Sequence, residues 1–135
     1  MIEKIEHIGI AVKKLDEANK IYEGLLETPP YKIETVKSEG VITSFFKTGE
    51  NTVELLQATK DESAIAKFIT KKGEGIHHIA FAVKDIHKEI KRLKEGGYTI
   101  INESPKKGAD NKLICFVHPK NTKGVLIELC QEIRL

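Results

Sequence analysis

The chain has 135 residues with 22 basic and 20 acidic side chains, and this near balance, a net charge of +2, excludes a dedicated surface for nucleic acid. No apolar run approaches the roughly 18 residues of a membrane-spanning helix, and the N-terminus lacks the apolar core of a signal peptide, so we expect a cytoplasmic protein with no membrane partner. At this length we expect a single domain, 1–135, and its two cysteines lack the spacing of a zinc site.

The first module, about 1–58, is predicted to open with a strand over 5–12. Along this strand, larger apolar residues alternate with His7, Gly9 and Ala11. Because successive side chains point to opposite faces of a sheet, the histidine shares its face with small neighbours. These small neighbours leave room for a ligand beside His7.

A helix follows in the first module, because residues 15–26 have helical periodicity. Its apolar stripe is formed by Leu15, Ala18, Ile21, Tyr22 and Leu25. Period-two alternation then predicts three strands, over 31–37, 41–48 and 52–58. The first module is therefore β-α-β-β-β.

A linking helix is predicted over 61–72, and the second module, about 76–131, repeats the pattern of the first. After its opening strand come a helix and three further strands, predicted over 86–95, 98–103, 112–118 and 124–131. The predicted fold class is α+β, with two β-α-β-β-β modules related by a pseudo-twofold axis and joined by the linking helix in a curved mixed sheet.

The opening segments of the two modules are similar in sequence. IEHIGIAVKKL at 5–15 and IHHIAFAVKDI at 76–86 match at six of eleven positions. His7 and His78 occupy the same position in the two copies, and each lies on the face with small neighbours. Internal repetition of this kind predicts two equivalent structural units.

The closing strands of the two modules are also similar. VELLQ at 53–57 corresponds to IELCQ at 127–131, and the separation between histidine and glutamate is nearly equal in the two modules. By strand alternation, the apolar residues on either side of each glutamate, such as Val53 and Ile127, pack inward. Glu54 and Glu128 therefore point to the opposite face. Each module therefore contributes one histidine and one carboxylate to what we expect to be a shared cup.

Two imidazoles and two carboxylates in an apolar setting predict a metal site. A carboxylate among Leu, Val and Ile is costly to desolvate unless a cation compensates it, and two such carboxylates repel each other. One divalent ion held by His7, Glu54, His78 and Glu128 removes both costs. Co, Mn, Ni, Fe and Zn all suit this mixed set of nitrogen and oxygen ligands.

Other polar residues near these motifs are assigned no ligand role. His77 falls on the packing face by alternation, and His118, in the turn HPK, is expected to order the chain before the last strand. Cys130 faces the cup by alternation and is expected to fill space as a small thiol.

The motifs resemble those of the glyoxalase, or vicinal oxygen chelate, superfamily, and within it the methylmalonyl-CoA epimerases. The similarity covers nearly the whole chain. It is carried by DESAIAKFITKKGEGIHHIAFAV at 61–83, IEHIGIAVKKLDEA at 5–18 and HPKNTKGVLIEL at 118–129. The His/Glu pairs mark only the superfamily, whereas the linking helix and the closing motif are more specific to the epimerases.

The resemblance implies metal ligands at His7, Glu54, His78 and Glu128, with Glu128 also acting as an acid/base. It also implies epimerisation at C2 of methylmalonyl-CoA, an acyl-CoA thioester substrate, and a homodimer. The second base of the family lies on the strand after a Gly-Val step, where this chain has Thr43. A threonine hydroxyl is too weak a base for a carbon-bound proton, so we expect Glu54 and Glu128 to form the acid/base pair.

Two alternative functions remain at this point. The same ligand set supports the proton shuttle of a glyoxalase I-type isomerase (lactoylglutathione lyase). A non-catalytic small-molecule-binding protein of the same fold is the other, and such proteins generally lack a complete ligand set. Metal content separates the binding protein from the enzymes, and exchange of the C2 proton separates the epimerase from the isomerase.

Overall fold

The computed structural model describes residues 1–102 and 104–133. Its helices are α1 (Leu15–Leu26), α2 (Ala64–Lys72) and α3 (Ile86–Glu95). Its strands are β1 (Ile2–Ala11), β2 (Lys32–Val36), β3 (Val41–Thr48), β4 (Asn51–Ala58), β5 (Gly75–Val83), β6 (Lys106–Lys107), β7 (Lys112–Val117) and β8 (Ile127–Glu132). The chain forms two compact units, an N-terminal unit, His7–His77, and a C-terminal unit made of Met1–Glu6 and the residues from His78 onward.

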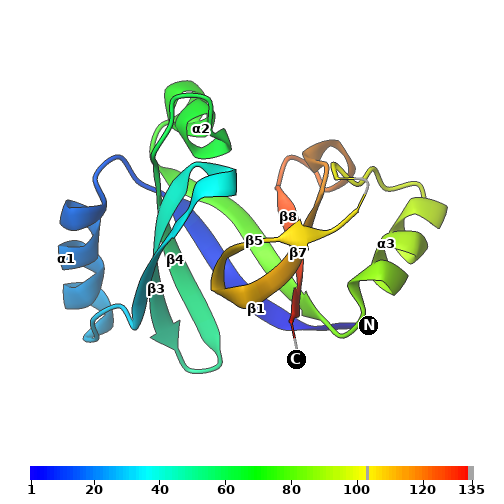
Figure 1. Ribbon diagram of the computed structural model, residues 1–135, viewed down its shortest axis with the longest axis horizontal. Helices are drawn as coiled ribbons and strands as arrows, with labels where there is room; N and C mark the ends of the chain where they lie inside the picture. Colours follow the sequence, from blue (N-terminus) through cyan, green and yellow to red (C-terminus); the bar gives the residue numbers. More distant parts are fainter. Residues whose placement is uncertain (103, 134–135) are drawn as a thin grey trace. The chain divides into compact units, whose positions relative to one another are not determined.

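In the N-terminal unit the strand order is β2-β3-β4-β1. Strand β1 runs parallel to β4, whereas β2, β3 and β4 are successive antiparallel neighbours. Helix α1 covers one face of these strands (Figure 1). The core beneath it contains Val12, Leu15, Ala18, Phe46 and Leu55. The residues between these along β3 and β4 point to the face away from α1.

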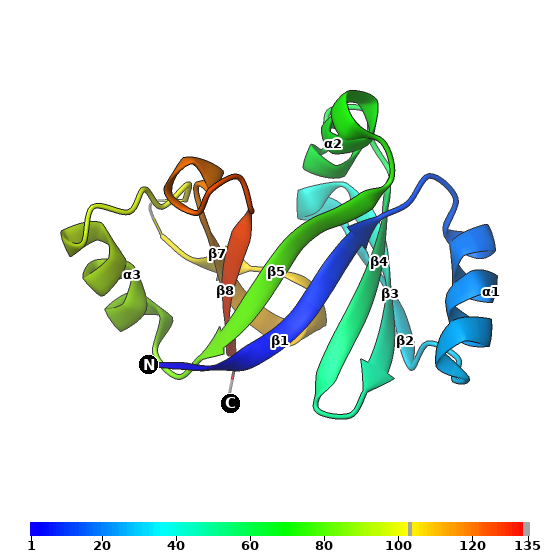
Figure 2. The same cartoon turned by 180° about the vertical axis from the view of Figure 1, so that it is seen from behind.

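The C-terminal unit repeats this arrangement, with the order β5-β8-β7-β6. Strand β5 is parallel to β8, and β8 is antiparallel to β7. Helix α3 lies against these strands as α1 does against its own (Figure 2). Its core contains Val83, Ile86, Ile90, Leu93, Ile100, Cys115, Val117 and Leu129. Both units therefore pack one helix on one face, whereas the other face carries polar side chains among apolar ones such as Phe45 and Ile114.

Two glutamines attach the helices to the sheets. Gln57 Oε1 of β4 accepts a hydrogen bond from the backbone N–H of Leu15, the first residue of α1, at 2.7 Å. Gln131 Oε1 of β8 accepts from the N–H of Ile86, the first residue of α3, also at 2.7 Å. The first N–H groups of a helix have no partner inside the helix, and the N-cap Lys14 supplies no side-chain acceptor. The repeated glutamine of the closing motif therefore stabilises the start of each helix.

The predicted fold class and the bounds of two helices are confirmed. The linking helix begins at Ala64 rather than at 61, because Ser63 caps it by accepting a hydrogen bond from the N–H of Ala66. The apolar stripe predicted for α1 is partly wrong. Ile21 and Leu25 are 66% and 70% exposed, because the face that packs contains Leu15, Ala18, Tyr22 and Leu26 instead.

A strand is predicted over 98–103, and Glu103 lies outside the described residues. For the described residues of this segment, 98–102, the prediction is wrong, because they form no continuous strand. Ile100 forms one isolated bridge with Val117, and the N–H of Ile101 donates to the carbonyl of Phe116. The ladder beside β7 is continued by the two-residue β6 instead. Pro105, directly before β6, has no N–H to donate to a neighbouring strand.

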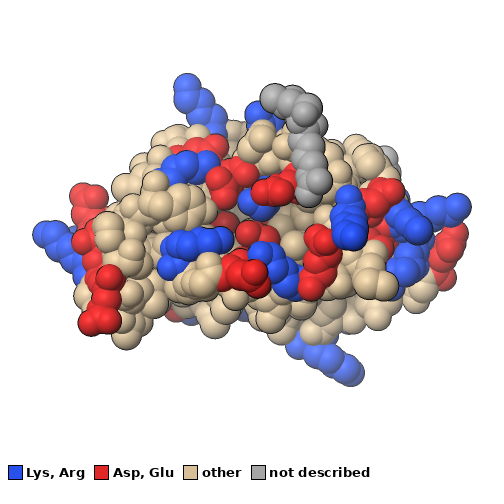
Figure 3. Space-filling model, turned by 90° about the horizontal axis from the view of Figure 1, so that it is seen from below, with Lys and Arg blue, Asp and Glu red and all other residues tan. Residues whose placement is uncertain are grey.

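The surface and the helices bear on possible partners. On the face shown in Figure 3, basic and acidic side chains are interspersed rather than separated into patches of one sign. Within residues 1–102 and 104–133, no helix combines the length and apolar character that crossing a bilayer requires.

We expect Gln57→Leu to lower the free energy of unfolding by about 1 kcal/mol, because it leaves the N–H of Leu15 without an acceptor. Urea denaturation measures this change. Gln57→Glu is the matched control, since a carboxylate keeps the acceptor at a helix N-terminus. Equal losses in the two variants would contradict the capping role.

Candidate metal centre and acid/base site

The N-terminal unit contains a buried His–Glu pair. Gly9 of β1 lies opposite Glu54 of β4, and His7 precedes Gly9 by two residues, so its side chain is on the same face as Glu54. His7 Nδ1 lies 3.1 Å from Glu54 Oε2, and the two side chains are only 4% and 8% exposed. The parallel pairing of β1 and β4 thus places an imidazole and a carboxylate side by side.

The C-terminal unit contains the equivalent pair. Ala80 of β5 lies opposite Glu128 of β8, and His78 precedes Ala80 by two residues. His78 Nε2 lies 3.3 Å from Glu128 Oε1, and both side chains are almost fully buried. The ring of Phe116 meets His78 edge to face at 6.1 Å between centroids.

The two pairs have the same construction. In each unit, the residue opposite the glutamate is small, Gly9 or Ala80, and the histidine occupies the same diagonal position. Buried carboxylates are stable only when donors or a cation compensate their lost hydration. Histidine nitrogen and carboxylate oxygen are also the donor types that borderline divalent metals prefer, so the side chains of each unit fit a metal. That all four ligate one ion stays a prediction.

Comparison with known proteins gives the family. Residues 6–116 match the family model of the glyoxalase/bleomycin resistance protein/dioxygenase superfamily. The ethylmalonyl-CoA/methylmalonyl-CoA epimerase of Cereibacter sphaeroides is 36% identical over 97% of this chain and 99% of its own. The chain belongs to the methylmalonyl-CoA epimerase family.

Solved structures of this epimerase family agree with the fold. A variant of Streptomyces coelicolor methylmalonyl-CoA epimerase in complex with 2-nitronate-propionyl-CoA has a TM-score of 0.95 at 31% identity, covering 99% of this chain and 100% of that one. A methylmalonyl-CoA epimerase in complex with methylmalonyl-CoA and NH4+ has a TM-score of 0.94 at 31% identity, covering 98% and 96%.

The other histidines discussed above lie outside the pairs. His77 contacts the ring of Phe68 in α2 edge-on, with 5.0 Å between centroids. His118 Nδ1 accepts a hydrogen bond from the N–H of Lys120 at 3.0 Å, which orders the turn before β8 as expected. Neither contact involves the glutamates of the pairs.

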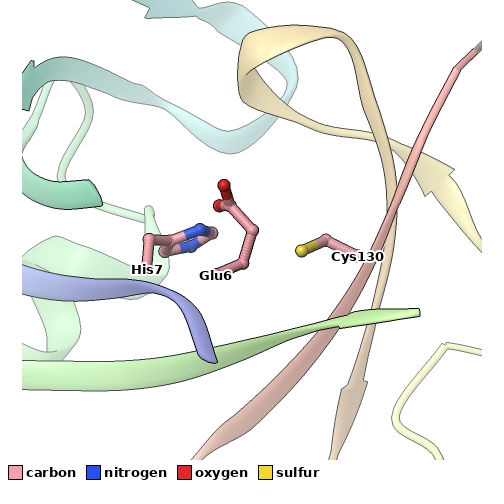
Figure 4. A group of neighbouring side chains, drawn as sticks. All are labelled: Glu6, His7 and Cys130. Carbon is pink, nitrogen blue, oxygen red and sulfur yellow. The ribbon is translucent and has the colours of Figure 1, made fainter. Parts of the chain in front are cut away.

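Cys130 has charged neighbours that the sequence did not indicate. Figure 4 shows the sulfur of Cys130, on β8, extending toward Glu6, on β1, and Sγ lies within 4.8 Å of a carboxylate oxygen of Glu6. Lys112 Nζ is 3.9 Å from Glu6 Oε2 and 3.3 Å from Asp110 Oδ2. Burial lowers the pKa of Lys112, but these two carboxylates outweigh it and raise the pKa. The thiol itself donates to the carbonyl of Phe81 at 3.6 Å.

A third buried carboxylate, Glu89 of α3, has a structural role. The amino group of Met1 lies 2.6 Å from Oε2, and Arg92 Nη2 lies 2.8 Å from Oε1. The hydrogen bond from this amino group and the contact with Arg92 lower the pKa of Glu89 although burial raises it. Glu89 is thus compensated by two cations of the chain itself, whereas Glu54 and Glu128 each lie beside an imidazole.

Neither cysteine is expected to react in the native protein. Burial and the charge of Glu128 raise the pKa of Cys115 to about 11, so roughly one thousandth of it is thiolate at pH 8. Cys130 is 1% exposed. A thiol reagent at pH 8 should therefore label the native protein slowly and label two thiols per chain in urea. Rapid labelling of one thiol in the native protein would contradict this assignment.

Proposed function

We propose that this chain interconverts the two C2 epimers of methylmalonyl-CoA by removing and returning the C2 proton. The observation that carries the proposal is the buried His–Glu pair, which occurs in the same construction in both units. Membership of the epimerase family supports the substrate, since relatives of 31–36% identity are named for this activity. The two units would act together as one domain with a single shared site.

His7, Glu54, His78 and Glu128 would hold one divalent ion, for which Co, Mn, Ni, Fe and Zn are candidates. When bound, such an ion supplies Lewis-acid polarisation to oxygens of the thioester and the carboxylate, which makes the C2 proton more acidic. The residues of the chain supply the ligands, keep water from the site through their burial, and carry the proton.

Glu54 and Glu128 would be the acid/base pair. In one direction, a carboxylate oxygen of one glutamate takes the C2 proton, and the electrons of the C–H bond move into the enolate of the thioester. The other glutamate, protonated, then gives its proton to the opposite face of C2. The roles exchange in the reverse direction. The two glutamates come from equivalent positions of the two units, which matches a reaction that must serve both faces of one carbon.

We expect the purified chain to bind about one divalent ion, and His78→Ala to lower its metal affinity by about 100-fold or more because a ligand is lost. Elemental analysis after dialysis and titration with Co²⁺ measure this. His77→Ala is the matched control, since the neighbouring imidazole contacts Phe68. Metal binding that is unchanged in His78→Ala would exclude the proposed centre.

We expect both Glu54→Gln and Glu128→Gln to slow exchange of the C2 proton of methylmalonyl-CoA with solvent deuterium by about 100-fold or more, because an amide cannot take up a proton. Metal content is measured on the same samples. Glu132→Gln, an exposed position on β8, is the control that should keep full exchange. Near-full activity in Glu54→Gln together with a dead Glu128→Gln would show that another group is the second acid/base.

The same exchange assay separates this function from that of a glyoxalase I-type isomerase, which acts on a glutathione hemithioacetal. The homodimer implied by the family and the cytoplasmic location stay predictions.

A further inference from the structure

Two adjacent hydroxyl groups of β3 are buried without a partner. Thr43 and Ser44 are both 0% exposed, and neither Thr43 Oγ1 nor Ser44 Oγ has a hydrogen-bond partner among the described residues. A buried hydroxyl that makes no hydrogen bond destabilises a folded protein, so each such group in a native structure requires an explanation.

The two hydroxyls lie on opposite faces of the sheet of the N-terminal unit. Thr43 pairs with Leu56 of β4, and the next residue of the same parity, Phe45, pairs with Glu54. Thr43 is therefore a diagonal neighbour of Glu54 on one face, with about 7–8 Å between their Cα atoms. Ser44 pairs with Leu55, which belongs to the core under α1.

Two threonines, Thr43 and Thr52, share this face with Glu54, and of their hydroxyls only that of Thr43 is buried without a hydrogen-bond partner among the described residues. The cross-strand neighbours of Thr43 are Leu56 on one side and Glu34 on the other. Glu34 is 35% exposed and its Oε1 lies 3.3 Å from Lys32 Nζ, so its charge is compensated.

We propose that the Thr43 hydroxyl donates a hydrogen bond to the carboxylate of the substrate's acyl group, an inference that rests on the proposed function. A substrate carboxylate placed beside the buried Glu54 loses its water and requires a donor from the protein. Phe45 and Leu56, on the same face, have no donor, and the imidazole of His7 already lies 3.1 Å from Glu54. The substrate would in turn satisfy the hydroxyl that the chain leaves without a partner, and so Thr43 selects for acyl-CoA thioesters with a carboxylate at C2.

The test compares Thr43→Val, which has the same shape without the hydroxyl, with Thr43→Ser, which keeps a hydroxyl, and with Ser44→Ala on the opposite face. Calorimetric titration measures the Kd of 2-nitronate-propionyl-CoA, whose nitronate oxygens stand in for the carboxylate, and of propionyl-CoA, which has no group at that position. Melting temperature and the KM for methylmalonyl-CoA are measured on the same proteins.

Thr43→Val should weaken binding of the nitronate about 10- to 100-fold and raise KM, as expected for one hydrogen bond to a charged group, while leaving the Kd of propionyl-CoA unchanged. Its melting temperature should not fall, because the hydroxyl has no protein partner to lose. Thr43→Ser should bind the nitronate within a few-fold of the wild type. Ser44→Ala should leave both Kd values unchanged.

Nitronate binding by Thr43→Val equal to the wild type would overturn the inference. So would equal losses for both ligands, which would indicate a change of site shape, or a lower melting temperature, which would show that protein or water satisfies the hydroxyl. Exchange at C2 by the wild-type protein is measured first. Its absence refutes the proposed function, whereas normal exchange with an unaffected Thr43→Val refutes only the role of Thr43.

Discussion

The desolvation of two glutamates is the constraint on which the site depends. Glu54 and Glu128 are each less than one-tenth exposed, and each has an imidazole within 3.3 Å or less. A carboxylate in such surroundings is stable only if its charge is compensated. In both units the compensation comes from the parallel neighbour strand, which holds a histidine at the diagonal position. The parallel pairing of β1 with β4 and of β5 with β8 is therefore what creates each His–Glu pair.

Strand alternation lets one short motif serve two functions. Within VELLQ and IELCQ, the glutamate points to the face with the histidine, and the glutamine three residues later points to the face with the helix. Gln57 and Gln131 stabilise the helix that directly follows the histidine-bearing strand. Each motif thus places a carboxylate beside a histidine, and its glutamine stabilises the start of the helix that follows the histidine's strand. This explains why both residues recur in the two copies.

Buried charged side chains outside the His–Glu pairs are compensated by ion pairs within the chain. Glu89 is paired with the amino group of Met1 and with Arg92, and Lys112 with Glu6 and Asp110. Each of these groups has a partner of opposite full charge from the chain itself. Glu54 and Glu128 each lie beside an imidazole, which is charged only when protonated, and Thr43, on the same face as Glu54, lacks a hydrogen-bond partner among the described residues. In the proposed function, a substrate beside Glu54 would supply the Thr43 hydroxyl with the partner that it lacks.

The sequence by itself determined the repeat, both helices of the modules, and the face to which each histidine and glutamate points, because periodicity and alternation are local properties of the chain. It did not predict that the described residues of this segment, 98–102, form only a single bridge, since ladder formation depends on which partner strand is already occupied. It also did not indicate that Gln57 and Gln131 would accept from helix N-termini, or that Lys112 would lie beside Glu6, because these contacts join residues far apart in the sequence. The exposure of Ile21 and Leu25 has the same origin, because tertiary packing decides which part of an apolar stripe is covered. Residue type and local periodicity identified the candidate site residues, and strand pairing decided which of their side chains lie in contact, because pairing joins segments that are distant in the sequence.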